Sequence, residues 1–281
     1  INFIDGTIYP ASTFGSTDST TGEWKINTSP SVTYGTNGFF ILKDGNSVTD
    51  QSGNSNNFTV GGGTLTKTED NPSNVFATLN PLDNFYQNAT LTNGNNYITT
   101  NGSAETFNLS TLGISSGKYY FEVKDISSSN EHHVGVSYSS PDASTDWLGN
   151  NFYSWGYEST GEVNNNGSVV GGTWATWGNN DIIGCAINMD NLQGGLNKLY
   201  FSKNGVWQNG ADPSNFTSTT GVVGITANKT YFFALGDKTG SSCQMATNFG
   251  NGVFNLTAVS SAGTNASNNG IFEYDVPTGF T

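Results

Sequence analysis

Turn-forming residues interrupt this sequence at short intervals, and this feature restricts the possible folds more than any other. The 281 residues include 38 Asn, 36 Gly and 66 Ser or Thr, which supply turns and left-handed backbone positions. Between the turns lie short runs rich in β-branched and aromatic residues, the types that fill strands. Lys and Arg together number only nine, and other helix-favouring residues are also scarce. We therefore expect an all-β protein without long helices.

The spacing of apolar residues predicts how the strands are arranged. Ile183, Cys185, Ile187 and Met189 occupy alternate positions, as in an antiparallel strand with one buried face. Asn204-Gly205 then joins two strand-like runs, and this dipeptide tolerates the positive φ angles of a two-residue type I′ turn. These features favour a two-sheet antiparallel β-sandwich. Further runs with strand periodicity lie at 96–100, 118–123, 133–138, 153–157, 181–189, 198–203, 229–235 and 244–249.

A compositional boundary near residue 83 predicts two parts. Residues 1–83 contain candidate strands at 38–43 and 57–60, and this block ends with two Asn-Pro pairs, which disfavour helix. We expect an N-terminal β segment or connector over 1–83 and a β-sandwich over 84–281. The chain starts with Ile1 and shows no signal-peptide pattern, so we expect it to be part of a longer or processed polypeptide.

The charge of the chain excludes several classes of partner. The formal net charge is −13, and clustered basic residues, which neutralise nucleic-acid phosphates or anionic lipids, are missing. No apolar run approaches the ~20 residues that span a bilayer, so we expect no membrane insertion. The two cysteines, Cys185 and Cys243, lie in apolar runs. We expect buried thiols there, and the sequence leaves open whether they pair.

Several of these runs resemble a SPRY domain in order and spacing, over about residues 84–281. This resemblance implies a SPRY or jelly-roll-like sandwich. It rests on the segments SGKYYFEV, HVGVSYSS, SWGYESTGEV, DIIGCAINMD, KLYFSKNGVWQ, TYFFALG and ATNFG. The N-terminal block resembles segments that precede SPRY-like domains in tail fibres and other structural proteins of marine phages. Its DQSGNSNNFTV run is similar to a turn of laminin-G-like lectin sandwiches, and the final YDVPTGFT is similar to the ending of the phage modules.

The resemblance implies a function outside catalysis. We expect a non-enzymatic structural module of a virion fibre that binds a host receptor or a surface glycan. Its expected location is the virion surface or the extracellular space, and its expected partners are other copies of itself or other fibre subunits. One alternative is a bacterial surface adhesin or extracellular filament subunit. A second alternative is a glycan-degrading enzyme module.

The sequence offers no catalytic constellation. It contains no nucleophile elbow, zinc-binding helix motif or Cys-x-x-Cys pair, and no cofactor is expected. A glycosidase needs two carboxylates facing one cleft, and the acidic residues of this chain follow no such pattern. His132 and His133, the only histidines, are adjacent at the start of a strand, and we expect them at an exposed edge.

Aromatic rings next to amide side chains form the candidate binding site. The rings offer stacking area and the amides offer both donors and acceptors, which suits a neutral ligand. Packing of the same rings in the sandwich is the alternative. The candidate residues are Trp147, Asn150, Asn151, Tyr157, Asn164, Asn165, Asn166, Trp174 and Trp177.

No metal site is predicted, although one loop is a weak candidate for calcium. Hard cations prefer several oxygen ligands on a turning loop, but the hydrogen bonds of Asx turns explain the same residue types. The candidate oxygen donors are Asp44, Asn46, Asp50, Ser52 and Asn54.

Overall fold

The structure is a computed structural model, and it contains two compact units, Ile1–Val75 and Phe76–Thr281. The sequence analysis placed the corresponding boundary slightly later, after residue 83. The structure describes residues 1–17, 24–43, 47–63, 65, 75–83, 89–102, 104–127, 131–238, 242–261, 263–264 and 270–281.

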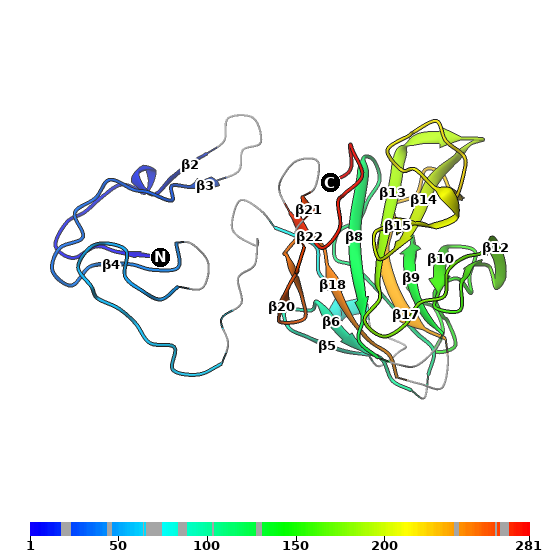
Figure 1. The fold of residues 1–281 in the computed structure, drawn as a ribbon, viewed down its shortest axis with the longest axis horizontal. Coiled ribbons are helices and arrows are strands. Elements are labelled where there is room, and N and C mark those ends of the chain that lie inside the picture. Colours follow the sequence, from blue (N-terminus) through cyan, green and yellow to red (C-terminus); the bar gives the residue numbers. More distant parts are fainter. Residues whose placement is uncertain are drawn as a thin grey trace. The chain divides into compact units, whose positions relative to one another are not determined.

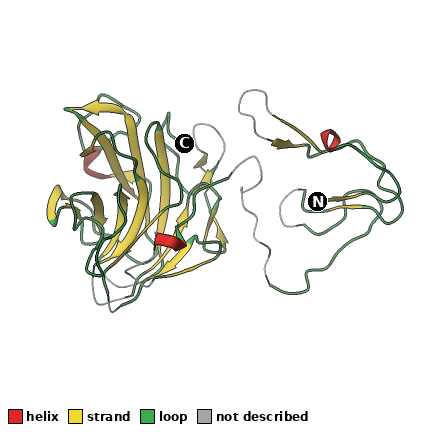
Figure 2. Cartoon of the chain, turned by 180° about the vertical axis from the view of Figure 1, so that it is seen from behind, coloured by secondary structure: helices red, strands yellow, loops and turns green. Residues whose placement is uncertain are grey.

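The described residues form an almost purely β structure, as predicted (Figure 2). Their helical content is limited to three single-turn 3₁₀ segments: η1 (Ala11–Thr13), η2 (Pro81–Asp83) and η3 (Gln208–Gly210). Within the described ranges, no helix has the length and apolar character needed to cross a membrane.

Two antiparallel sheets build the second unit (Figure 1). The six-stranded sheet has the order β12 (Ser168–Thr173), β11 (Glu162–Asn165), β10 (Ser154–Glu158), β9 (His132–Ser137), β17 (Phe232–Asp237) and β7 (Thr106–Leu109). The larger sheet has the order β15 (Val206–Trp207), β14 (Leu196–Lys203), β13 (Ile182–Gln193), β8 (Lys118–Asp125), β18 (Gln244–Asn248), β6 (Tyr97–Thr99) and β5 (Thr90–Thr92), with β16 (Val223–Thr226) paired to β14. Two small ribbons, β19 (Val253–Phe254) with β20 (Thr257–Ala258) and β21 (Gly263–Thr264) with β22 (Ile271–Phe272), complete the unit.

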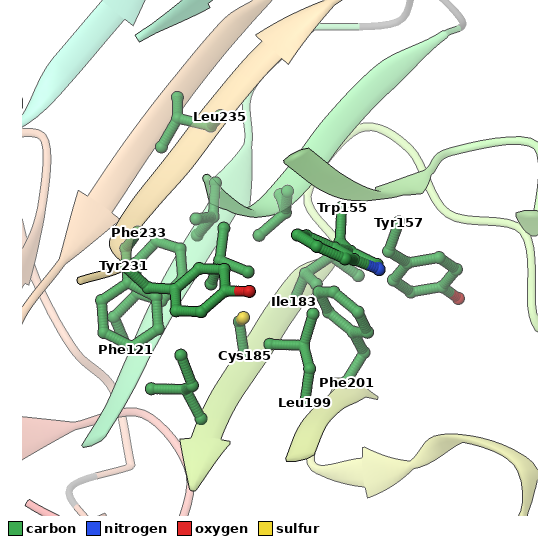
Figure 3. Close-up of a cluster of buried hydrophobic side chains, with 14 of the residues drawn as sticks. Phe121, Trp155, Tyr157, Ile183, Cys185, Leu199, Phe201, Tyr231, Phe233 and Leu235 are labelled. Carbon is green, nitrogen blue, oxygen red and sulfur yellow. The ribbon is translucent and has the colours of Figure 1, made fainter. Parts of the chain in front are cut away.

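The main hydrophobic core lies between these two sheets (Figure 3). Ile183, Cys185, Ile187 and Met189 of β13 all point into it, so the predicted alternation is confirmed. Across the core, Phe121 of β8 packs against Phe233 of β17 with ring centroids 4.2 Å apart. Both cysteines are buried free thiols.

The predicted Asn-Gly hairpin is present. Asn204 and Gly205 have φ angles of 49° and 79°, and Lys203 pairs directly with Val206. Positive φ at both positions is the signature of a type I′ turn. The turn fixes the register between β14 and β15.

Replacing Gly205 with Val should lower the free energy of unfolding by about 1 kcal/mol or more. A β-branched residue resists positive φ, and a Cβ atom at this position would come within 2.6 Å of the Tyr274 ring. Thermal denaturation measures the effect. Gly178→Val is the matched control, because that glycine has open space around it and no positive φ. An unchanged melting temperature for Gly205→Val contradicts this assignment of the turn.

The first unit contains two short ribbons, β1 (Asn2–Phe3) with β4 (Phe39–Phe40) and β2 (Gly15–Thr17) with β3 (Trp24–Ile26). The strand predicted over 38–43 is therefore limited to β4. The strand predicted at 57–60 is wrong, since these residues are irregular. The side chain of Asn57 instead accepts a hydrogen bond from the Asp50 backbone, so polar side chains organise this segment in place of a strand ladder.

The weak calcium candidate lies in the same unit. Asp44 and Asn46 fall outside the described residues. The Asp50 carboxylate accepts hydrogen bonds from the backbone of Phe40, Ser52 and Asn56 and from the Ser52 hydroxyl. Although burial opposes ionisation, these donors lower the pKa of Asp50 to about 2. The Asn54 amide donates to the carbonyls of Gly35 and Gly38. The described candidates thus act as turn-forming groups.

The C-terminal segment, residues 270–281, covers the outer face of the larger sheet. Phe272 and Phe280 are buried there in a second apolar cluster with Tyr120 and Tyr200. Glu122 of β8 accepts hydrogen bonds from the backbone N–H groups of Glu273 (2.8 Å) and Tyr274 (2.9 Å). The backbone of Thr281 pairs with Lys118 and Tyr120 beside β8, where the red segment runs in Figure 1.

Candidate functional site

The four aromatic rings predicted to bind a ligand are buried. Trp147, Tyr157, Trp174 and Trp177 expose only 8%, 0%, 7% and 6% of their surface. Tyr157, Trp174 and Trp177 belong to the core between the sheets. Their polar atoms turn toward nearby backbone: the Tyr157 hydroxyl donates to the Ala175 carbonyl, and the Trp174 indole donates to Gly171. This burial favours the packing alternative, and ligand binding by these rings stays a prediction.

The predicted asparagines, in contrast, gather at the surface. Asn150 and Asn151 lie in the loop before β10, Asn165 is the last residue of β11, and Asn166 begins the turn that follows. With Phe152 they form what we call the asparagine shelf. Phe152 is 64% exposed, Asn166 is exposed and the other three are half-buried. The fifth predicted amide, Asn164, is separate from the shelf, because it is buried and donates to Glu158.

Hydrogen bonds join the loop before β10 to the end of β11 and the turn that follows it. The Asn165 amide donates to the backbone carbonyls of Asn151 (3.3 Å), Phe152 (3.4 Å) and Ser154 (2.8 Å). The backbone N–H groups of Asn166 and Gly167 donate to the carbonyls of Asn151 and Gly149. Asn166 and Gly167 themselves form a second Asn-Gly turn with positive φ, between β11 and β12. The shelf is therefore a preorganised surface, which lowers the entropy lost on binding.

Gly156 of β10 allows the loop before β10 to lie close to the six-stranded sheet. A Cβ atom at Gly156 would lie 2.2 Å from the Leu148 carbonyl oxygen, so only glycine permits this approach. Leu148 is completely buried against the outer face of the six-stranded sheet, in an apolar cluster with Phe107, Leu109 and Tyr153. This packing anchors the loop that carries Phe152.

A group of charged and aromatic residues lies beside this anchor. The Trp147 ring lies 5.1 Å from the His133 ring, and the Lys238 ammonium lies 4.6 Å from the Trp147 ring centroid. Glu158 lies 3.4 Å from His133 Nε2 and 3.9 Å from Lys238 Nζ. Burial lowers the pKa of His133. Burial alone would raise the pKa of Glu158, but hydrogen bonding with His133 and the nearby Lys238 lower it to about 2.

Both histidines are fully buried, so the expectation of an exposed edge is wrong. Strand β9 lies between β10 and β17, with the core on one face and the loop before β10 on the other. His132 points to the core side, where its Nδ1 lies 3.0 Å from the Asp125 carboxylate. The acidic residues Glu122, Asp125 and Glu158 are also buried. These groups therefore do not present the paired carboxylates of a glycosidase cleft.

The two chain segments that carry the shelf are themselves uncharged. Residues 147–157 and 163–180 contain no Asp, Glu, Lys, Arg or His, although the whole chain carries a net charge of −13. Protein-binding surfaces have charge-depleted centres with aromatic residues. Phe152, surrounded by amides and without neighbouring charge in sequence, matches this pattern. The sequence analysis did not select Phe152, because it favoured the tryptophans as binding residues. The absence of charged residues on either side of Phe152 could have pointed to it.

Part of the chain matches one family model. Residues 118–237, which run from the start of β8 to the end of β17, match the model of the SPRY domain. Among curated proteins, the chain is similar to a probable ATP-dependent RNA helicase, ddx1, of Dictyostelium discoideum, with 34% identity over 114 residues. That region is 40% of this chain but only 13% of the helicase.

Solved structures of SPRY domains are also similar to this chain. The SPRY domain of human HERC1 matches with 15% identity and a TM-score of 0.47, over 60% of this chain and 96% of that domain. Another human SPRY domain matches with 20% identity and a TM-score of 0.40, over 56% of this chain and 92% of that chain.

Proposed function

We propose that this chain, whose residues 118–237 match the SPRY domain, is a non-enzymatic module that binds a protein partner through the asparagine shelf. SPRY domains are typically protein–protein interaction modules and generally not enzymes. The matched region is a small part of the helicase, and helicase activity is therefore not transferred to this chain.

One observation supports the choice of surface: Phe152 is 64% exposed on a loop that hydrogen bonds join to the end of β11 and the turn after it. An exposed aromatic ring on a rigid frame gains contact area at little entropy cost, as in binding hot spots. The surrounding amides can satisfy the polar groups of a partner backbone. Since the segments that carry the shelf contain no charged residue, its contacts should depend little on salt.

Replacing Phe152 with Ser should weaken partner binding by about tenfold or more, since truncating a hot-spot ring costs roughly 2 kcal/mol. The test is selection of binders from a yeast-displayed library of random peptides, followed by affinity measurement with the purified chain. Leu112→Ser is the matched control, because Leu112 is 53% exposed elsewhere on the second unit. Equal affinities for both variants and the unchanged protein contradict the proposed surface.

The finer proposal is that the partner is a host receptor or surface glycan and that the module belongs to a virion fibre. It is supported by the resemblance of residues 1–83 and of the PTGF ending to phage structural proteins, and by the neutral amide-rich shelf. In this proposal the chain resides at the virion surface or in the extracellular space. Mass spectrometry of purified phage particles tests it: peptides of this chain support the proposal, and their occurrence only in cell-envelope fractions favours the adhesin alternative.

A further inference from the structure

Strand β12 is an open edge of the six-stranded sheet. It pairs with β11 on one side, through Asn164 with Val169 and Asn165 with Ser168. Among the described residues, no strand pairs with its other side. Val169 and Val170, which point to opposite faces of the strand, are each 49% exposed. Both faces and one backbone edge of this strand therefore remain open to a partner.

The opposite edge of the same sheet is covered. There, β7 is covered by the preceding chain: Asn80 N–H donates to the Leu109 carbonyl, and Leu79 forms an isolated bridge with Ser110. The Asp83 carboxylate accepts a hydrogen bond from the Leu109 N–H. Natural proteins also protect open edges with lysine or proline. The β12 sequence, Ser-Val-Val-Gly-Gly-Thr, contains neither.

The charge distribution indicates what kind of partner fits β12. Residues 163–180 carry no charge, and the acidic residue nearest to β12 along the chain, Glu162, pairs with Thr173 at the opposite end of the strand from Ser168 and Val169. A basic partner would gain most from binding the acidic parts of the surface. A second copy of this chain carries the same net charge of −13, and its approach is least opposed where neither copy presents charge.

We propose that two copies of this chain associate by antiparallel pairing of their β12 strands across a two-fold axis. Such a contact is self-complementary, because the same short strand supplies both sides. Backbone hydrogen bonds join the two six-stranded sheets into one continuous sheet, and Val169 and Val170 of each copy cover those of the other. The proposal goes beyond partner binding at the asparagine shelf, since it concerns a neighbouring strand and a different partner.

Sedimentation-velocity ultracentrifugation of the full 281-residue chain over a concentration series tests the pairing. The unchanged protein should show a monomer–dimer equilibrium. Val170→Lys should raise the dimer dissociation constant by about tenfold or more, because an ammonium group would then face its symmetry copy across the pair. Val206→Lys is the matched control, since Val206 is 68% exposed on the other sheet. It should leave the dimer unchanged.

The salt dependence gives a second readout that needs no variant. Added salt screens the repulsion between two copies of charge −13, so the dimer should become tighter. A dimer held by ion pairs would become weaker, which overturns the proposal. A protein that stays monomeric at all concentrations, or a dimer equally stable in both lysine variants, also overturns it.

Phe152→Ser separates this proposal from the proposed function. The substitution should abolish peptide binding at the shelf and leave the dimer intact. If Phe152→Ser dissociates the dimer while Val170→Lys does not, the two copies associate through the shelf and the β12 proposal is wrong. If the unchanged protein stays monomeric and Val170→Lys instead abolishes peptide binding, β12 binds an extended peptide and the proposal is also wrong.

Discussion

Replacing Phe280 with Ala should lower the free energy of unfolding of the second unit by about 3–5 kcal/mol. The Phe280 side chain is completely buried. Its ring lies 6.5 Å from those of both Tyr200 and Phe216, centroid to centroid. Truncation would leave a cavity and would weaken the attachment of the C-terminal segment, so both the transfer and the cavity costs apply. The expected decrease in melting temperature is about 10 °C.

Phe152→Ala is the control for Phe280→Ala. It removes the same number of atoms from an exposed position, so its expected effect is within about 0.5 kcal/mol. Chemical denaturation of both variants measures the difference. A loss below about 1 kcal/mol for Phe280→Ala contradicts the view that residues 270–281 are an integral part of the fold.

The buried Glu122 carboxyl should make the stability of the second unit depend on pH near neutrality. Burial raises the pKa of Glu122 from 4.5 to about 7, even though the N–H groups of Glu273 and Tyr274 favour the ionised form. The folded protein therefore keeps a proton that the unfolded chain has lost between these two pH values. Unfolding releases that proton, so the free energy of unfolding falls as the pH rises from about 4.5 to about 7. The expected decrease from this residue is about 2–3 kcal/mol.

Glu122→Gln isolates this contribution, since glutamine has nearly the same shape and does not ionise. Denaturation of both proteins across this pH range gives the difference in their stabilities. At low pH the variant should be the less stable by about 1–3 kcal/mol, because its amide faces backbone N–H donors. The difference should then shrink as the pH rises. His133, whose pKa is lowered, has the opposite pH dependence, but it is present in both proteins and cancels. A difference that is constant with pH contradicts the assigned role of Glu122.

The regular parts of the fold could be predicted from sequence because local and tertiary requirements agree there. In β13 the alternation of Ile183, Cys185 and Ile187 matches a strand with one buried face. Asn204-Gly205 matches the type I′ turn that connects two antiparallel strands with two residues. Strand β12 was missed, since Gly171 and Gly172 weaken its strand character. It forms because the Asn166-Gly167 turn directs the chain back along β11.

The candidate site could be predicted only in part, because the burial of an aromatic ring depends on distant segments. Trp147 is covered by His133 and Lys238, and Tyr157 by both sheets, which no local pattern reveals. The amides Asn150, Asn151, Asn165 and Asn166 lie in or next to turns, where they are half-buried or exposed, and their role in binding stays a prediction. The burial of Glu122 could also have been suspected from the sequence. Glu122 is a single carboxylate between apolar residues in the run Tyr-Phe-Glu-Val, whose alternate residues face the core.

Hydrogen–deuterium exchange of the full chain, with and without a peptide selected from the displayed library, tests the central claim most directly. The claim is that the β-sandwich of the second unit presents the asparagine shelf as its binding surface. We predict that the peptide slows exchange in residues 148–153 and 165–167, whose backbone groups the shelf brings together. The same regions should show no protection in the Phe152→Ser variant. Protection confined to residues 1–75, or to the C-terminal segment 270–281, would contradict the claim.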